Sequence, residues 1–314
     1  MGFVSSVHGH YLGLADFESR WRDLAARVGA RESQAGTSVQ GRPLWRFDFG
    51  SRDPGAPAVL LTALIHGVEV IGSVTLMDVA SRLIAEGSLP EGARFTVMPI
   101  VNPDAFATNM DRLARGHSAH QRKNANGVDL NRNFPIVGNA KPWHPFSGSS
   151  YKMMPHYRGP HPLSEPESRA VHDVAVEIRP RLAVGFHSFG NMLLYPWAHC
   201  RQENPRLPLY RKLAVGFSRA VGKTPYRCRQ AVDLYPTLGD LDDWLDVQFK
   251  TLALTVEVGG LDRRLLHPSR LLNPFWWMNP TRILSTVANV SPGVVGLLRA
   301  GLNPAALLPS PSVL

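Results

Sequence analysis

Cysteine is scarce in this chain of 314 residues, which contains only Cys200 and Cys228. Two cysteines are too few for a disulfide framework and lack the spacing of a metal site, although one bridge between them stays open. No uninterrupted apolar run reaches membrane-spanning length, and the first ten residues lack the basic start and apolar stretch of a signal peptide. We therefore expect a cytoplasmic protein with no membrane partner.

Blocks of like charge are also missing, although the formal net charge is +9. The arginines are scattered, with no basic stripe interleaved with aromatic side chains, which argues against a nucleic-acid partner. Internal repeats and linker-like segments are absent as well. Because 44% of the residues are hydrophobic, the chain can bury one large core, and we expect a single domain over residues 1–314. The oligomeric state stays open.

What the chain does have is an apolar run of strand length, residues 58–65, that leads directly to His66 and Glu69. A continuous apolar run is typical of a strand buried on both faces of a sheet. Residues 70–83 follow with helical spacing, so the His and Glu are expected at the carboxyl end of a central strand, where open α/β sheets bind ligands. Without a third ligand, an ordinary polar turn explains this pair better.

Two further apolar runs end in residues of the same kind. Residues 181–186 lead to His187, and residues 249–256 lead to Glu257. If these strands lie parallel and adjacent to the first, their carboxyl ends converge at one place. A core histidine with satisfied hydrogen bonds explains His187 alone, but several placements that agree with one another favour a shared site.

Two imidazoles and one carboxylate are typical of a catalytic zinc site, in which a fourth coordination position stays open. The sequence thus predicts one Zn²⁺ per chain, held by His66, Glu69 and His187. Zinc acidifies a bound water, and Glu257, which is not needed as a ligand, is the candidate general base. Asp129 can accept the remaining imidazole N–H of His66.

The remaining pattern predicts further elements. Helices are expected at residues 11–29, 164–178, 207–221 and 283–298, the second capped by Ser164 and the last broken near Pro292. A structural role is expected for Glu165 and Glu167 at the start of the second helix. Further strands are expected on both sides of a turn within 37–49, at 95–101 and at 192–197, and irregular segments at 109–127 and 228–243.

Seven short motifs follow one another along the chain: residues 66–69 (HGVE), 127–134 (GVDLNRNF), 164–167 (SEPE), 187–189 (HSF), 193–196 (LLYP), 235–244 (YPTLGDLDDW) and 255–257 (TVE). In this order they resemble the zinc carboxypeptidases of the carboxypeptidase A/B family, over about residues 11–285. The resemblance implies a three-layer α/β/α sandwich around a mixed, about eight-stranded sheet. Residues 286–314 are then a C-terminal extension of unknown role.

The resemblance also implies roles outside the zinc ligands. It places Asn131, Arg132 and Tyr235 on the terminal carboxylate of a peptide substrate, and Arg122 where it polarises the scissile carbonyl. Arg115 is the alternative for this last role, because the preceding loop differs in length from the family's. An arginine fork suits a carboxylate, and a fixed cation stabilises an oxyanion as it forms.

The spacing from Tyr235 to Trp244 equals that of the family, so positions in between can be carried across. Asp242 then falls at the base of the specificity pocket, where family members that prefer Lys or Arg have Asp, and Asp240 falls on its wall. The resemblance therefore implies a preference for basic C-terminal residues. The alternative is that Asp240 or Asp242 caps a turn.

The chain also departs from the family, with Val68 in place of a common Arg and Phe189 in place of a Tyr. Residues 124–135 are also similar to bacterial murein peptide amidases, cytoplasmic enzymes that cut the γ-D-glutamyl–diaminopimelate bond, and this is the alternative substrate. A non-catalytic peptide-binding relative and a deacylase are further alternatives. The complete set of ligands and base favours catalysis over a binding role.

Overall fold

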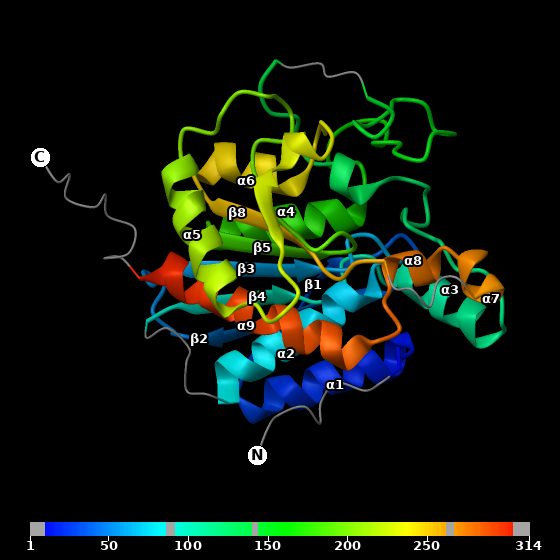
Figure 1. Cartoon of the computed structure of the whole chain (residues 1–314), viewed down its shortest axis with the longest axis horizontal. Helices are drawn as coiled ribbons and strands as arrows, with labels where there is room; N and C mark the ends of the chain where they lie inside the picture. The colour runs from blue at the N-terminus through cyan, green and yellow to red at the C-terminus, as the bar shows by residue number, and fades with distance from the viewer. Residues whose placement is uncertain (1–9, 86–91, 140–143, 262–266, 304–314) are drawn as a thin grey trace, which may run out of the picture.

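The computed structural model describes residues 10–85, 92–139, 144–261 and 267–303, and its centre is one eight-stranded sheet (Figure 1). The strand order is β1-β2-β4-β3-β5-β8-β6-β7. The strands are β1 (Arg31–Thr37), β2 (Pro43–Gly50), β3 (Ala58–Ala63), β4 (Arg94–Met98), β5 (Leu182–His187), β6 (Met192–Tyr195), β7 (Arg227–Gln230) and β8 (Leu252–Glu257). The pairs in the middle are parallel, β1–β2, β2–β4 and β8–β6 are antiparallel, and the edge pair β6–β7 is parallel again, so the sheet is mixed, as predicted.

Helices cover both faces of the sheet and complete the three layers (Figure 1). The α-helices of the described residues are α1 (Leu14–Arg27), α2 (Val70–Ala85), α3 (Pro103–Ala114), α4 (Pro166–Ile178), α5 (Leu207–Ala220), α6 (Leu241–Phe249), α7 (Pro268–Leu271), α8 (Phe275–Met278) and α9 (Ile283–Leu302). Side chains of α1, α2, α5 and α9 share one hydrophobic core, and those of α4 and α6 share the other. The predicted α/β/α sandwich is confirmed.

The central strand β3 shows why its sequence is continuously apolar. Val59 and Leu61 point into the core on the α2 side, whereas Ala58 and Leu60 point into the core on the α4 side. Every residue of this strand is buried, because both faces of the sheet are covered. The predicted doubly buried strand before His66 is therefore confirmed.

Close packing of α2 against β5 brings two of the predicted ligands together. A Cβ atom at Gly72 would lie 2.7 Å from the carbonyl oxygen of Phe186, so the glycine lets the helix approach the strand. Because Glu69 immediately precedes this helix and His187 ends the strand, the same approach sets the spacing between Glu69 and His187.

Several predicted elements were wrong where local signals were misread. Residues 109–114 belong to α3, which begins with Asn102 as a capping side chain and Pro103 in its first turn. The segment 228–243 was predicted to be irregular, but it contains most of β7 and the start of α6. Strand β1 lies before the predicted range, because this exposed edge strand has no apolar pattern to reveal it.

The start of α4 and the middle of α9 also differ from the prediction. Ser164 does not cap α4; its hydroxyl donates to the Glu165 carboxylate at 2.7 Å, and Glu165 takes the capping position. Helix α9 continues through Pro292 without a break. Packing of α9 against α2 and α5 offsets the backbone hydrogen bond that proline cannot make.

The segment Phe275–Leu302 is, by length and composition, apolar enough to cross a membrane, although polar residues such as Asn279 and Arg282 interrupt it. Half of its most apolar window is buried, and residues such as Val290, Val294 and Leu298 lie in the core. A core helix passes the same test.

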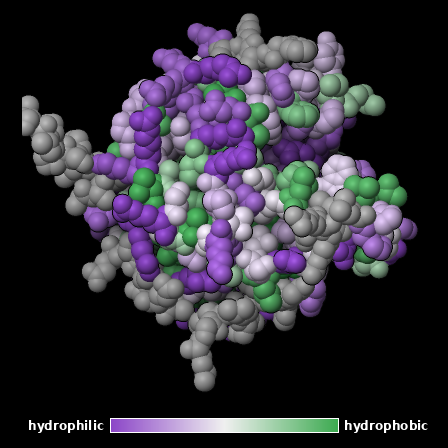
Figure 2. Space-filling model, in the orientation of Figure 1, coloured by the Kyte–Doolittle hydropathy of each residue, from purple (hydrophilic) through white to green (hydrophobic). Residues whose placement is uncertain are grey.

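On the face in Figure 2, hydrophobic residues form small separate groups among hydrophilic ones. Most of the predicted C-terminal extension is thus core helix, and residues 304–314 lie outside the described part.

Both cysteines are free, and the bridge that the sequence left open is not formed. Cys200 follows the β6 region, and Cys228 lies in β7, where its sulfur is 3.7 Å from the Ser218 hydroxyl. The fold therefore depends on its two hydrophobic cores and not on a covalent link.

Candidate active site

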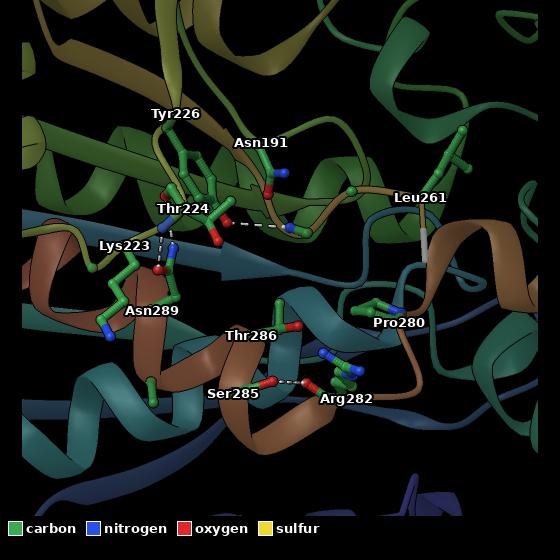
Figure 3. A pocket seen from close by; sticks show the side chains of 14 residues that line it. Asn191, Lys223, Thr224, Tyr226, Leu261, Pro280, Arg282, Ser285, Thr286 and Asn289 are labelled. Atoms are coloured by element: carbon green, nitrogen blue, oxygen red, sulfur yellow. Dashed lines mark hydrogen bonds between the residues drawn. The ribbon is translucent and has the colours of Figure 1, made fainter. Parts of the chain in front are cut away.

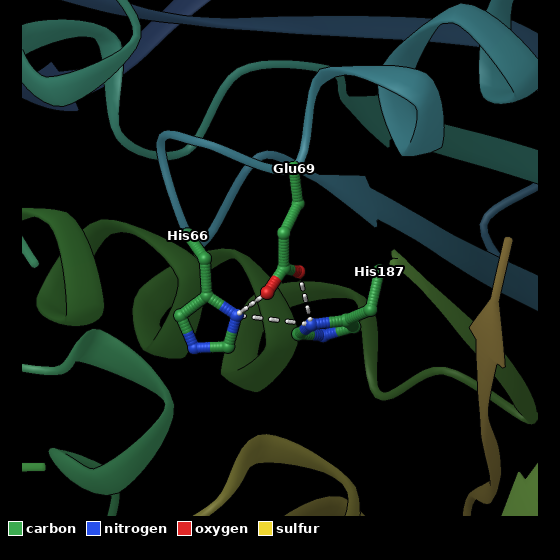
Figure 4. Close-up of side chains that lie close together, drawn as sticks. All are labelled: His66, Glu69 and His187. Atoms are coloured by element: carbon green, nitrogen blue, oxygen red, sulfur yellow. Dashed lines mark hydrogen bonds and ion pairs between the residues drawn. The ribbon is translucent and has the colours of Figure 1, made fainter. Parts of the chain in front are cut away.

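His66, Glu69 and His187 meet at the carboxyl ends of β3 and β5 (Figure 4). The His66 Nδ1 atom lies 2.9 Å from one Glu69 oxygen, and the His187 Nδ1 atom lies 3.0 Å from the other. The two Nδ1 atoms are 3.2 Å apart. All three side chains are buried, so a cluster of three possible ligand atoms is shielded from bulk water.

The turn that carries His66 and Glu69 is held by a residue more than 200 positions away. The Asn279 side chain donates to the Val68 carbonyl at 2.7 Å and accepts from the Ile71 N–H at 2.9 Å. Asn279 is fully buried. It therefore fixes the backbone between the strand and the helix, a role that no local pattern in the sequence indicated.

Asp129 is fully buried beside this cluster and accepts hydrogen bonds at both carboxylate oxygens. Its Oδ1 atom lies 3.1 Å from His66 Nε2 and accepts from the Asn131 N–H. Its Oδ2 atom accepts from Arg122 Nε at 3.2 Å and lies 3.0 Å from His156 Nδ1. Burial alone raises the pKa of Asp129, but the nearby cations, led by Arg122, outweigh it and hold the pKa well below 3.8.

Of the two arginines considered for the scissile carbonyl, the structure places Arg122 at the cluster. Its Nη1 atom lies 2.8 Å from a Glu69 oxygen, while its Nε donates to Asp129. Arg115 is exposed at the C-terminal end of α3. Arg122 therefore presents a fixed positive charge beside the predicted ligands, and Arg115 does not.

Glu257 ends β8 and pairs in register with His187, the last residue of β5. Burial is the main cause that raises the pKa of Glu257 to about 7. Together with weaker repulsion from Glu69 and Asp242, it outweighs the attraction of His187 and Arg122. A cation held by the neighbouring ligands would lower this pKa again. The carboxyl group is thus placed next to the cluster with its proton affinity near neutrality, which suits acid–base chemistry.

The three residues predicted to bind a carboxylate also lie together, but Arg132 and Asn131 already make hydrogen bonds within the protein. Arg132 is buried, and its Nε and Nη2 atoms both donate to the Phe146 carbonyl at 3.1 Å. The Asn131 side-chain oxygen accepts from the Leu241 N–H. The Arg132 guanidinium lies 6.0 Å from the centre of the Tyr235 ring, within the range of a cation–π contact.

The two acidic residues of the predicted specificity pocket differ in their surroundings. Asp240 caps α6: its oxygens accept from the Asp243 N–H at 3.0 Å and from the Thr237 hydroxyl at 2.8 Å. The capping alternative therefore holds for Asp240, and each of its two oxygens already accepts one hydrogen bond. Asp242 accepts from the Thr255 hydroxyl at 2.7 Å. Burial first, and Asp240 next, raise the pKa of Asp242 to about 7 despite this bond.

The sequence did not indicate two residues of the site. The His156 ring contacts Asp129, and the Phe146 carbonyl accepts two hydrogen bonds from the Arg132 guanidinium. Both residues lie in the irregular segment before α4, where no hydrophobic periodicity marks them. Phe146 also packs edge-on against the Tyr235 ring at 5.4 Å. Their only local signal is the length of that segment, which is unusual for a connection without secondary structure.

A separate open hollow of about 580 Å³ lies between the end of β8 and the start of α9 (Figure 3). Its lining includes Tyr226, whose hydroxyl accepts from the Gly259 N–H, and the exposed side chain of Arg282. None of the residues predicted for the site lines it. The buried cluster is therefore the candidate active site.

The family model described as zinc carboxypeptidase matches residues 20–280 of this chain. A metallocarboxypeptidase A-like protein of Trichophyton verrucosum is 26% identical over 282 residues, which are 84% of this chain and 65% of the relative. This chain thus spans slightly less than two thirds of that relative's length.

Two solved structures share the fold. Carboxypeptidase A from Helicoverpa armigera has a TM-score of 0.76 at 22% identity, covering 95% of this chain and 75% of that one. Murein-tripeptide amidase from Escherichia coli O157 has a TM-score of 0.50 at 24% identity, covering 83% and 91%. Because both identities are below 25%, these similarities show only that the fold is shared.

Proposed function

Because this chain belongs to the zinc carboxypeptidase family, we propose that it is a zinc-dependent metallocarboxypeptidase that removes C-terminal residues from peptides. The observation that carries the proposal is the convergence of His66, Glu69 and His187, whose ligand atoms all lie within 4.8 Å of one another. Two imidazole nitrogens that face each other across a carboxylate are a donor set that suits Zn²⁺. When bound, zinc polarises a carbonyl and acidifies water.

Glu257 is proposed to take the proton of the attacking water and to pass it to the leaving amine. Its place beside His187 and its raised pKa both support this role. Arg122 is proposed to stabilise the negative charge that develops on the scissile carbonyl oxygen. Its contacts to Glu69 and Asp129 hold the guanidinium in place before the reaction begins, so little reorganisation is needed.

Recognition of the substrate's C-terminus is proposed for Asn131, Arg132 and Tyr235. Arg132 donates to the Phe146 carbonyl, a neutral acceptor, and a carboxylate forms stronger, charge-assisted hydrogen bonds with the same fork. We therefore expect substrate to compete with Phe146 for the guanidinium.

A preference for Lys or Arg at the C-terminus is proposed for Asp242. Its carboxylate accepts one bond from Thr255 and lies in a partly buried position, where a substrate cation is a better partner than an apolar group. Asp240 is not assigned to this role, since it caps α6.

A panel of peptides with varied C-terminal residues, assayed with and without a chelator, tests the proposal. We expect release of a single C-terminal Lys or Arg, loss of activity with the chelator, and no cleavage when the C-terminus is amidated. Efficient cleavage of amidated peptides or of internal bonds contradicts an exopeptidase.

Murein peptide amidase activity is the second candidate. Residues 124–135 favour it through their similarity to such enzymes, and this chain covers 91% of the murein-tripeptide amidase structure from Escherichia coli O157. Asp242 does not separate the two candidates, because diaminopimelate also carries an ammonium group. Parallel assays of the murein tripeptide and of a peptide ending in Lys decide: a kcat/KM at least tenfold higher for the tripeptide favours the amidase.

A further inference from the structure

We propose that His156 is a positioning residue of the zinc site, which acts through Asp129 on the orientation of His66. The proposal rests on the proposed function in one respect, that His66 is a metal ligand. Its evidence is a line of contacts that runs from the metal cluster, through the buried carboxylate, to the segment that contacts Tyr235.

The Asp129 carboxylate lies between two imidazoles. Its Oδ1 atom is 3.1 Å from His66 Nε2, and its Oδ2 atom is 3.0 Å from His156 Nδ1. Burial lowers the pKa of His156, and Arg122 and Arg132 lower it further against the opposing effect of Asp129. A neutral ring facing an ionised carboxylate carries its proton on the facing atom, so His156 donates from Nδ1.

His156 restricts how the carboxylate can turn. Without it, Arg122 Nε, at 3.2 Å, is the one hydrogen-bond donor that the described residues offer to Asp129 Oδ2, and the same guanidinium also reaches Glu69. Asp129 is fully buried, so water does not readily replace a lost donor. A carboxylate that rotates toward Arg122 orients His66 less well, and outer partners of this kind tune metal affinity.

His156 also joins the metal side of the site to the substrate side. Its ring packs edge-on against Phe146 at 5.1 Å, and Phe146 contacts the Tyr235 ring and accepts from Arg132. The backbone is anchored on both sides, since the His156 carbonyl accepts from the Ser149 N–H and the Tyr157 carbonyl accepts from the Asp129 N–H. The imidazole is thus held against Asp129 by main-chain bonds and by ring packing.

Gln and Met have nearly the same shape, so substituting each of them for His156 separates the effect of the hydrogen bond from that of the packing. His156→Gln keeps an N–H donor, whereas His156→Met has a similar shape and no donor. His156→Phe keeps the ring contact with Phe146 and loses the donor. His161→Phe is the matched control, because the ring of this exposed histidine lies 3.0 Å from the Pro162 carbonyl, and the hydrogen bond from Asn133 goes to the backbone carbonyl, which the substitution keeps.

The readouts are the zinc dissociation constant from chelator competition, and kcat and KM for a peptide ending in Lys. We expect the Met and Phe variants to bind zinc about tenfold more weakly, with kcat reduced and KM changed by less than twofold. This is the lower end of the range for loss of a ligand's own outer partner, because His156 acts one contact further out, through Asp129. The Gln variant is expected to recover most of the affinity, and His161→Phe to match the unchanged protein.

The proposal is overturned if His156→Met binds zinc within twofold of the unchanged protein, or if the Gln and Met variants lose affinity equally. Thermal unfolding of the metal-free proteins identifies a variant that does not fold, and His156→Phe then replaces Met in the comparison. Zinc affinity needs no substrate, so absence of peptidase activity in the unchanged protein refutes the proposed function and leaves this test intact.

Discussion

Glu257 and His187 are direct neighbours across the parallel strands β8 and β5, at the last register position of the pair. Each strand contributes one residue of different chemistry at the same edge: a ligand-type imidazole and a carboxyl group with a pKa raised to about 7. The sheet itself therefore sets the spacing between the predicted metal ligand and the predicted base. This spacing does not depend on a flexible loop.

The first prediction concerns the metal. His66→Ala removes one of three ligand atoms, so we expect the purified variant to contain little zinc, while the unchanged protein contains one zinc per chain. Metal analysis after dialysis measures this. His117→Ala, at an exposed histidine after α3, is the control and should keep its zinc. Full zinc content in His66→Ala contradicts the assignment.

The second prediction concerns Glu257. Glu257→Gln keeps the size of the side chain and removes its ability to take a proton, so kcat should fall by about 10²–10⁴-fold with zinc content unchanged. Single-turnover kinetics with a peptide ending in Lys measure the effect. Glu203→Gln, at an exposed glutamate, should leave kcat unchanged. A near-normal kcat in Glu257→Gln means that another group is the base.

The third prediction concerns side-chain preference. Asp242→Ile replaces a carboxylate in a partly buried position with an apolar group, so preference for C-terminal Lys over Leu should reverse. The ratio of kcat/KM values for the two substrates measures it. Asp246→Asn is unsuitable as a control, because Asp246 accepts from Trp197, Asn204 and Tyr210. Asp173→Asn, at an exposed residue of α4, should keep the original order. An unchanged order in Asp242→Ile removes Asp242 as the selector.

The fourth prediction concerns stability and pH. The pKa of Asp242 is about 7 in the folded protein and 3.8 in the unfolded reference, so the folded state binds the proton more tightly. Its contribution to stability is fully present below pH 3.8 and is lost as pH rises through 7. Asp242→Asn carries no such loss, so its Tm relative to the unchanged protein should rise between pH 4 and 8. Thermal unfolding in chelator measures this, and a Tm difference that is constant with pH contradicts it.

The sequence by itself determined the elements whose signals are local. Continuous apolar runs revealed β3 and β5, because both faces of each strand are buried, and the residues that follow them mark the active edge of the sheet. The family motifs added the sheet type and the candidate roles. Signals were also present but misread at α3, where Asn102 and Pro103 start a helix.

Only the tertiary structure decided which side chains meet. Asn279 supports the turn after β3 from 211 positions away along the chain, and His156 reaches Asp129 from a segment without periodicity. The choice between Arg122 and Arg115, and the different roles of Asp240 and Asp242, depended on the same kind of information. Local spacing encodes strands, helices and caps, whereas hydrogen bonds between distant segments exist only once packing has brought those segments together.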